Sequence, residues 1–123
     1  MCPQDVVPLE TLGVDAAWVS NHAGRQFSGS PSAIQMLPEI RTATNLPLIF
    51  DSGINSGLDM MRAIALGADF VMMGRAWHYA LGAVGGAGPR HLHDMLVDDL
   101  KSNMIQIAAS NLGQLKELLH SPQ

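Results

Sequence analysis

The chain has little of what several protein classes require. Its 123 residues include a single cysteine, Cys2, which excludes an internal disulfide and cannot form a zinc site on its own. Seven Lys and Arg against eleven Asp and Glu give a net charge of −4 with no basic run, so nucleic acid is not an expected partner. No apolar stretch approaches the ~18 residues of a transmembrane helix. The first residues also lack the basic region of a signal peptide, and these absences together predict a cytoplasmic protein.

What the sequence does contain is three short apolar runs separated by segments of helical period. The runs cover residues 16–20, 46–50 and 70–73, and each is too short for a helix and almost unbroken in hydrophobicity. This pattern is typical of parallel strands that are covered on both faces. With 47% hydrophobic and 15% charged residues, the chain is expected to fold as one domain over residues 1–123.

Helical segments with recognisable ends flank these runs. We expect one helix to begin after an N-cap at Ser30, with Pro31 at its first position, and Pro38 to end or kink it early. A second helix closes at Gly67, and the pair Gly88-Pro89 opens the longest one. The remaining helices are expected over residues 3–12 and 112–119.

Repeated βα units fit either an open doubly wound sheet or part of a (β/α)8 barrel. A complete barrel needs about 250 residues and eight strands, so three strands correspond to roughly half of one. An open sheet of three strands would leave two edges in need of cover. The hydrophobic pattern leaves both folds open.

The segment after the first apolar run carries His22 and Arg25. In α/β folds ligands bind beyond the carboxyl ends of the strands, so both side chains would face such a site. An imidazole moves protons near neutral pH, and a guanidinium matches a carboxylate with two parallel hydrogen bonds. Together they would bind a small carboxylic acid, with Arg25 at its carboxylate and His22 on its α-carbon side. An equally weighted alternative is a loop in which His22 caps a helix and Arg25 is solvated.

Glycine-containing loops follow the other two runs, at residues 51–57 and at Gly74-Arg75. Such loops bring backbone N–H groups and a helix start close to an anion, and Arg75 adds a positive charge. Phosphate sites of barrels are commonly built from two successive loops of this kind and a short helix, which residues 75–80 would supply. The alternative is that these glycines only make tight turns between strand and helix.

Three motifs, in their order and spacing, resemble the FMN-dependent α-hydroxy-acid dehydrogenases and oxidases: Asn21-His22-x-Gly24-Arg25-Gln26, Asp51-Ser52-Gly53-Ile54, and Gly67-Ala68-Asp69 with Gly74-Arg75-Ala76. The Asp-Ser-Gly-Ile form is most similar to the bacterial L-lactate dehydrogenase branch. The resemblance runs from about Pro3 to Leu119 and covers only the C-terminal part of the family's barrel. It implies an α/β fold that is a partial (β/α)8 TIM barrel, with strands six to eight and their flanking helices.

The resemblance also implies a reaction, the FMN-dependent oxidation of a small (S)-2-hydroxy acid such as L-lactate to the 2-oxo acid. In that mapping His22 is the base that takes the substrate's proton, and Arg25 binds the substrate carboxylate. Asp51 would contact the ribityl chain of the flavin, and Gly53 would be one of the residues that bind its phosphate. The whole cofactor side implied by the resemblance comprises Asp51, Ser52, Gly53, Asn55, Gly74 and Arg75.

The chain departs from the family's pattern at Ala23, where a glycine is usual, and at Asn55, where a phosphate-binding arginine is usual. Ala23 is expected to be tolerated if its φ angle is negative. Loss of a charge-assisted contact at Asn55 would weaken FMN binding by about 1.5–3 kcal/mol. Strands one to five of the family's barrel have no counterpart in the chain, and half of the flavin pocket is missing with them.

This incompleteness predicts that the isolated chain is inactive or only a binder. Its unpaired strand edges predict a homo-oligomer or docking to a missing N-terminal half-barrel. Peripheral association with a membrane, which occurs in some relatives, stays open. The alternative functions are a phosphate- or FMN-binding half-barrel module without catalysis and a gene remnant.

Several other side chains are expected to be structural. We predict that Trp18 and Trp77 pack under the strands and that His78 packs or caps in its short helix. Asp98-Asp99 is expected to form a solvated helix face. No metal site is expected.

Overall fold

The computed structural model of the chain describes residues 2–120. Its strands are β1 (Ala17–Val19), β2 (Leu48–Phe50) and β3 (Phe70–Val71). The α-helices are α1 (Pro3–Val6), α2 (Ala33–Ala43), α3 (Gly57–Ala65), α4 (Arg75–Val84), α5 (Gly88–Gln106) and α6 (Leu112–His120). Short 3-10 turns lie at η1 (Val7–Leu9), η2 (His22–Gly24) and η3 (Gly85–Ala87). None of the helices in the described range is long and apolar enough to cross a bilayer.

The three strands pair in parallel and in chain order, which confirms the predicted α/β class. Trp18 lies opposite Ile49, and Ile49 lies opposite Phe70 on the next strand. The third strand is shorter than its apolar run predicts, although Met72 N–H still donates to the Phe50 carbonyl at 2.8 Å. Because all three strands run the same way, their carboxyl ends meet at one edge of the sheet.

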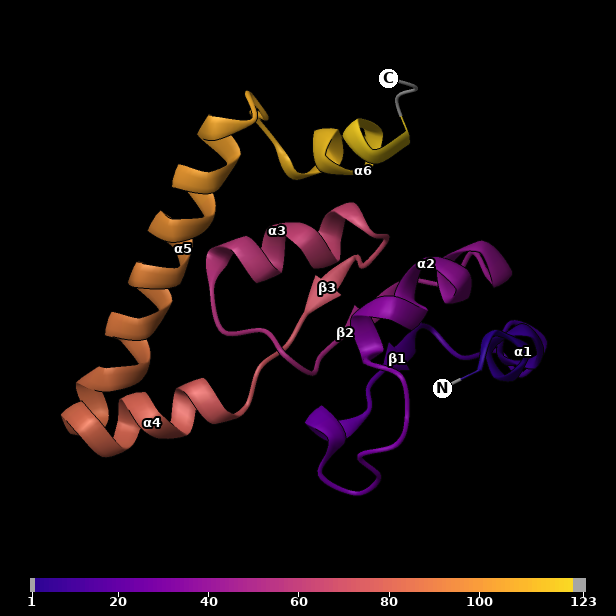
Figure 1. Ribbon diagram of the computed structural model, residues 1–123, viewed down its shortest axis with the longest axis horizontal. Coiled ribbons are helices and arrows are strands. Elements are labelled where there is room, and N and C mark those ends of the chain that lie inside the picture. Colours follow the sequence, from indigo (N-terminus) through magenta and orange to yellow (C-terminus); the bar gives the residue numbers. More distant parts are fainter. Residues whose placement is uncertain (1, 121–123) are drawn as a thin grey trace.

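One face of this sheet is packed and the other is open. Val19 and Phe50 belong to the packed face, where they join α2 residues such as Leu37 in the main core. On the opposite face Trp18 is 58% exposed and Phe70 is 70% exposed. The expectation of cover on both faces is therefore wrong, and so is the prediction that Trp18 packs under the strands. The reason is that side chains alternate along a strand, and α2 and α3 lie together on the packed side, as Figure 1 shows.

The helix ends differ from expectation where proline and serine are concerned. The predicted helix over residues 3–12 divides into α1 and η1, because Pro8 has no N–H to continue an α-helical ladder. The N-cap of α2 is Ser32, whose backbone N–H donates to Gln35 Oε1, while Ser30 Oγ instead donates to the Phe27 carbonyl. Pro38 lies inside α2 without ending it, since buried neighbours on the same helix hold it against the sheet.

Helices α4 and α5 form an arm that extends beyond the sheet and returns alongside α3 (Figure 1). At the crossing, a Cβ atom on Gly57 would lie 2.1 Å from the Leu100 nitrogen, so only glycine fits. The Gly57 N–H donates to Asp99 Oδ2 at 2.6 Å. Asp99 is exposed, as predicted, but it also holds the first residue of α3, which the prediction of a solvated face missed. Trp77 is half-buried within α4.

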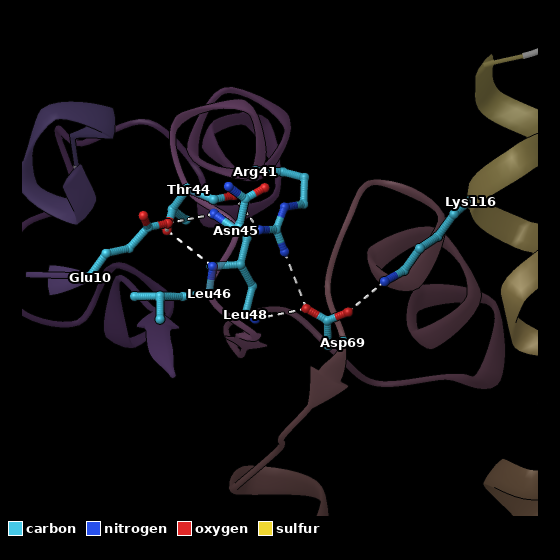
Figure 2. Close-up of polar contacts among 8 residues, drawn as sticks. All are labelled: Glu10, Arg41, Thr44, Asn45, Leu46, Leu48, Asp69 and Lys116. Atoms are coloured by element: carbon cyan, nitrogen blue, oxygen red, sulfur yellow. Dashed lines mark hydrogen bonds and ion pairs between the residues drawn. The ribbon is translucent and has the colours of Figure 1, made fainter. Parts of the chain in front are cut away.

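Asp69 ties together the edge of the sheet where the strands begin (Figure 2). One of its carboxylate oxygens accepts from Lys116 Nζ at 2.6 Å, and the other accepts from Arg41 Nη1 at 3.2 Å and from Leu48 N–H at 2.9 Å. Partial burial opposes ionisation, but these contacts outweigh it and hold the pKa of Asp69 below its ordinary value. Nearby, hydrogen bonds from Thr44 Oγ1 and the Asn45 N–H lower the pKa of Glu10.

Replacing Asp69 with Asn is expected to lower the free energy of unfolding at pH 7 by about 1 kcal/mol, a value reduced for solvent screening. A carboxyl whose pKa is lowered by folding stabilises the protein above its ordinary pKa of 3.8 and loses that effect as the pH falls through the folded value. Asp69→Asn should therefore destabilise the chain at pH 7, and by a progressively smaller amount as the pH falls below 3.8, as measured by urea unfolding. Asp94→Asn, on the exposed surface of α5, serves as the matched control with a smaller change. Equal urea midpoints for Asp69→Asn and the parent at pH 7 would contradict this account.

Candidate functional site

The loops that follow the three strands meet around a cavity of about 540 Å3. The first loop follows β1, the second follows β2, and the third joins β3 to the first turn of α4. All eight side chains or glycines predicted from the sequence line this one cavity: His22, Arg25, Asp51, Ser52, Gly53, Asn55, Gly74 and Arg75. Residues separated by up to 53 positions are thus brought together by the parallel sheet.

The turn that carries His22 has an unusual backbone. His22 and Ala23 have φ angles of +52° and +56°, in the left-handed region that disfavours residues with a Cβ atom. The negative φ on which tolerance of Ala23 was made to depend is not found, and the position keeps the conformation for which glycine is suited. Among the described residues only four non-glycines have positive φ angles, and three of them line this cavity: His22, Ala23 and Ser52. Concentrated strain of this kind is typical of functional sites.

Hydrogen bonds between two of the loops hold that turn in place. Ser52 Oγ accepts from the N–H groups of Asn21 and Ala23, each at 3.2 Å, and donates to Asp51 Oδ1 at 2.7 Å. The N–H of His22 donates to Ser20 Oγ at 3.2 Å. The loop after β1 is therefore fastened to the loop after β2 through side-chain oxygens.

The other side of the cavity offers donors to an anion. Gly53 and Gly74 have open space where a Cβ atom would stand, so a ligand can approach their backbone closely. Arg75 is the first residue of α4, whose N-terminus adds a favourable dipole. At Asn55 the side-chain Nδ2 donates to the Gly53 carbonyl at 3.3 Å, which steadies the loop instead of supplying a charge.

His78 lines the cavity as well, although the sequence predicts only a structural role for it. Its Nδ1 lies 3.0 Å from the Gly74 carbonyl, one turn earlier in the chain. It lies three residues after Arg75 in α4, so the two side chains share a helix face. The three-residue spacing from Arg75 is the feature of the sequence from which a place for His78 at the cavity could be predicted. The cavity also includes residues that sequence reasoning did not select, namely Gln26, Ile54, Met72 and Met73.

The charge of the cavity is opposite to that of the whole chain. Arg25 and Arg75 both line it, against one carboxylate from Asp51. In the described part of the chain neither guanidinium forms an ion pair, whereas four of the other five basic residues do: Arg41, Arg62, Arg90 and Lys116. Two uncompensated guanidiniums in a protein of net charge −4 favour an anionic ligand.

Comparison with known proteins identifies the family. A sequence profile of the FMN-dependent dehydrogenase family matches residues 1–121. The chain belongs to this family. The recognition made from the three motifs is thereby confirmed, and FMN is the cofactor of the family.

Family members of known activity match most of this chain but extend well beyond it. An L-lactate oxidase from Alicycliphilus denitrificans is 41% identical over 115 residues, which are 92% of this chain and 32% of that protein. An L-lactate dehydrogenase from Pseudomonas paraeruginosa is 42% identical over 115 residues, or 92% of this chain and 30% of that protein. The chain therefore spans about a third of the length of the curated relatives that it matches.

Solved structures of the family show the same relation. A mandelate oxidase variant with a monooxide FMN adduct superposes with a TM-score of 0.89 at 34% identity, covering 94% of this chain and 38% of the other. A lactate oxidase from Pediococcus acidilactici gives a TM-score of 0.89 at 35% identity, covering 94% of this chain and 33% of the other. The described fold is therefore shared with a part of these larger flavoenzymes.

Replacing Ala23 with Gly is expected to raise the free energy of unfolding by about 1 kcal/mol, because glycine adopts a φ of +56° without steric cost. Ala83→Gly is the matched control, since Ala83 is an exposed residue within α4 and glycine there costs about 1 kcal/mol. Thermal unfolding followed by circular dichroism should thus move in opposite directions for the two variants. A lower melting temperature for Ala23→Gly would show that the turn is not strained as described.

Proposed function

We propose that the chain provides the substrate-acid and phosphate side of an FMN-dependent 2-hydroxy-acid dehydrogenase or oxidase of the L-lactate type. Its three strands would then be strands six to eight of a partial (β/α)8 barrel, and residues 1–123 a single partial-barrel domain. One observation carries the proposal: the acid-binding and phosphate-binding motifs, which come from three separate loops, line one cavity. The relatives named for L-lactate support the substrate class.

The residues present fit the polar parts of FMN. The cavity of about 540 Å3 lies within the ~300–1,000 Å3 typical of ligand sites. Gly74 and Arg75 would hold the phosphate, with open backbone at Gly53 beside them, and Asp51 would face the ribityl hydroxyls. Apolar side chains such as Met72 and Ile54 line the same space. The donor set therefore suits a phosphate monoester that carries a polar chain.

Two side chains of the loop after β1, Arg25 and His22, would have different roles toward the substrate. Arg25 would bind the carboxylate with its planar fork and so fix the position of the α-carbon. His22 would take one of the two protons that the α-hydroxy acid loses as it becomes the 2-oxo acid. FMN, when bound, accepts the two electrons and the other proton as a hydride equivalent. The strained turn keeps the His22 side chain on the same rim as Arg25.

The chain requires a further surface to enclose a flavin. It spans about a third of its relatives' length, and its sheet leaves Trp18 and Phe70 exposed on an uncovered face. A second copy of the chain or a separate N-terminal half-barrel would supply that cover. The same short coverage favours one alternative function, a half-barrel module that binds FMN or another phosphate without catalysis.

The test combines binding and flavin reduction. FMN fluorescence should be quenched by the chain, and Arg75→Gln should weaken the affinity by about tenfold, as expected for one charge-assisted contact. When the chain is co-purified with the remaining two thirds of a lactate dehydrogenase of the family, L-lactate should bleach the flavin. His22→Asn should then slow bleaching by a factor of about 10²–10⁴ and leave FMN affinity unchanged.

Arg90→Gln provides the control, because Arg90 pairs with Asp94 on the exposed face of α5 and should affect neither measurement. Bleaching that is equally fast in His22→Asn would refute the catalytic role. Binding that depends on Arg75 with no bleaching in any reconstituted sample would favour the non-catalytic module.

A further inference from the structure

We infer that the Ser52 hydroxyl is a positioning group, which sets the His22 turn against the loop proposed to hold FMN and does not itself bind the cofactor. The inference rests on the proposed function for the roles of His22 and of the loop after β2. It assigns Ser52 a task different from the direct cofactor contact that the resemblance implies. The evidence is the pattern of hydrogen bonds around one oxygen atom.

The hydrogen-bonding capacity of Ser52 Oγ is fully used within the protein. A serine hydroxyl has one hydrogen to donate and two lone pairs to accept with. The hydrogen goes to Asp51 Oδ1 at 2.7 Å, and the lone pairs take the N–H groups of Asn21 and Ala23, each at 3.2 Å. No hydrogen or lone pair of Ser52 Oγ is left for a hydrogen bond to a ligand atom, so the hydroxyl bonds only to other parts of the protein.

The two N–H groups that Ser52 accepts stand on either side of His22. The N–H of His22 itself is taken by Ser20 Oγ at 3.2 Å, and that oxygen lies 3.5 Å from Ser52 Oγ. Three consecutive backbone amides are therefore held by two neighbouring hydroxyls. Because these amides define the peptide planes around His22, the hydroxyls determine where its side chain leaves the backbone.

The turn needs such a restraint because its conformation is unfavourable by itself. His22 and Ala23 lie in the left-handed region, and Ser52 has a φ of +82°, although none of the three is a glycine. Left-handed non-glycine residues persist where the surrounding contacts determine them. Here each strained loop provides a partner for the other, since the Ser52 oxygen restrains the turn and the turn's N–H groups restrain Ser52.

Asp51 extends this linkage to the cofactor side. Its carboxylate accepts the Ser52 hydrogen and lines the cavity next to Gly53. With that hydrogen committed to Asp51, both Ser52 lone pairs face the backbone amides of the turn. A loop that holds FMN would in this way also hold the residue that takes the substrate's proton.

Backbone amide exchange tests the inference without any ligand. Ser52→Ala and Ser52→Gly both remove the hydroxyl, but glycine also removes the strain at φ +82°. We expect the amides of Asn21 and Ala23 to exchange about tenfold faster or more in both variants. The amide of Met72, which pairs with β2, should be unchanged and reports that the sheet is intact. Ser102→Ala, at an exposed position of α5, is the control.

A second readout separates positioning from cofactor binding. In the reconstituted, FMN-loaded protein, both Ser52 variants should lower kcat for L-lactate by about tenfold or more, with the FMN dissociation constant within about twofold of the parent. Unchanged exchange at Asn21 and Ala23, or protection that survives in Ser52→Gly, would overturn the inference. A loss of FMN affinity with unchanged exchange would also overturn it, in favour of direct contact. Failure of the parent to reduce FMN would reject the proposed function instead, because the exchange result needs no flavin.

Discussion

The parallel pairing of three short strands is the constraint on which the rest of this structure depends. Ala17 lies opposite Leu48 and Ile49 lies opposite Phe70, so every strand ends at the same edge of the sheet. This arrangement places the loops around residues 22, 52 and 74 about one cavity. Val19 and Phe50 hold the register, because shifting a strand by one residue would turn these buried side chains to the open face.

The two edges of the sheet are built for different tasks. Where the strands begin, Asp69 joins β2 to α2 and α6 through Leu48, Arg41 and Lys116, which stabilises the fold (Figure 2). Where the strands end, the backbone is strained, and neither Arg25 nor Arg75 forms an ion pair within residues 2–120. Separation of stability and chemistry between the two ends is the general plan of parallel α/β enzymes.

The sequence predicts those features that are decided locally or by motif. Short apolar runs locate all three strands, and the residues that follow them identify the lining of the cavity. Features that depend on contacts with residues distant in the sequence are harder to predict from the sequence alone. The exposed position of Trp18 depends on which side the helices pack, and the N-cap at Ser32 depends on the reach of Gln35. The positive φ of Ala23 follows from a serine 29 residues away, which no local pattern reveals.

The central claim is that one edge of a three-stranded sheet forms a combined phosphate and acid site. Titration of the ¹⁵N-labelled chain with FMN and, separately, with riboflavin tests it most directly, because the two ligands differ only by the phosphate. The account predicts that FMN shifts the backbone amide signals of Gly53, Gly74 and Arg75 and that riboflavin shifts them far less. Equal shifts with both ligands, or FMN-specific shifts confined to other parts of the chain such as α5, would contradict it.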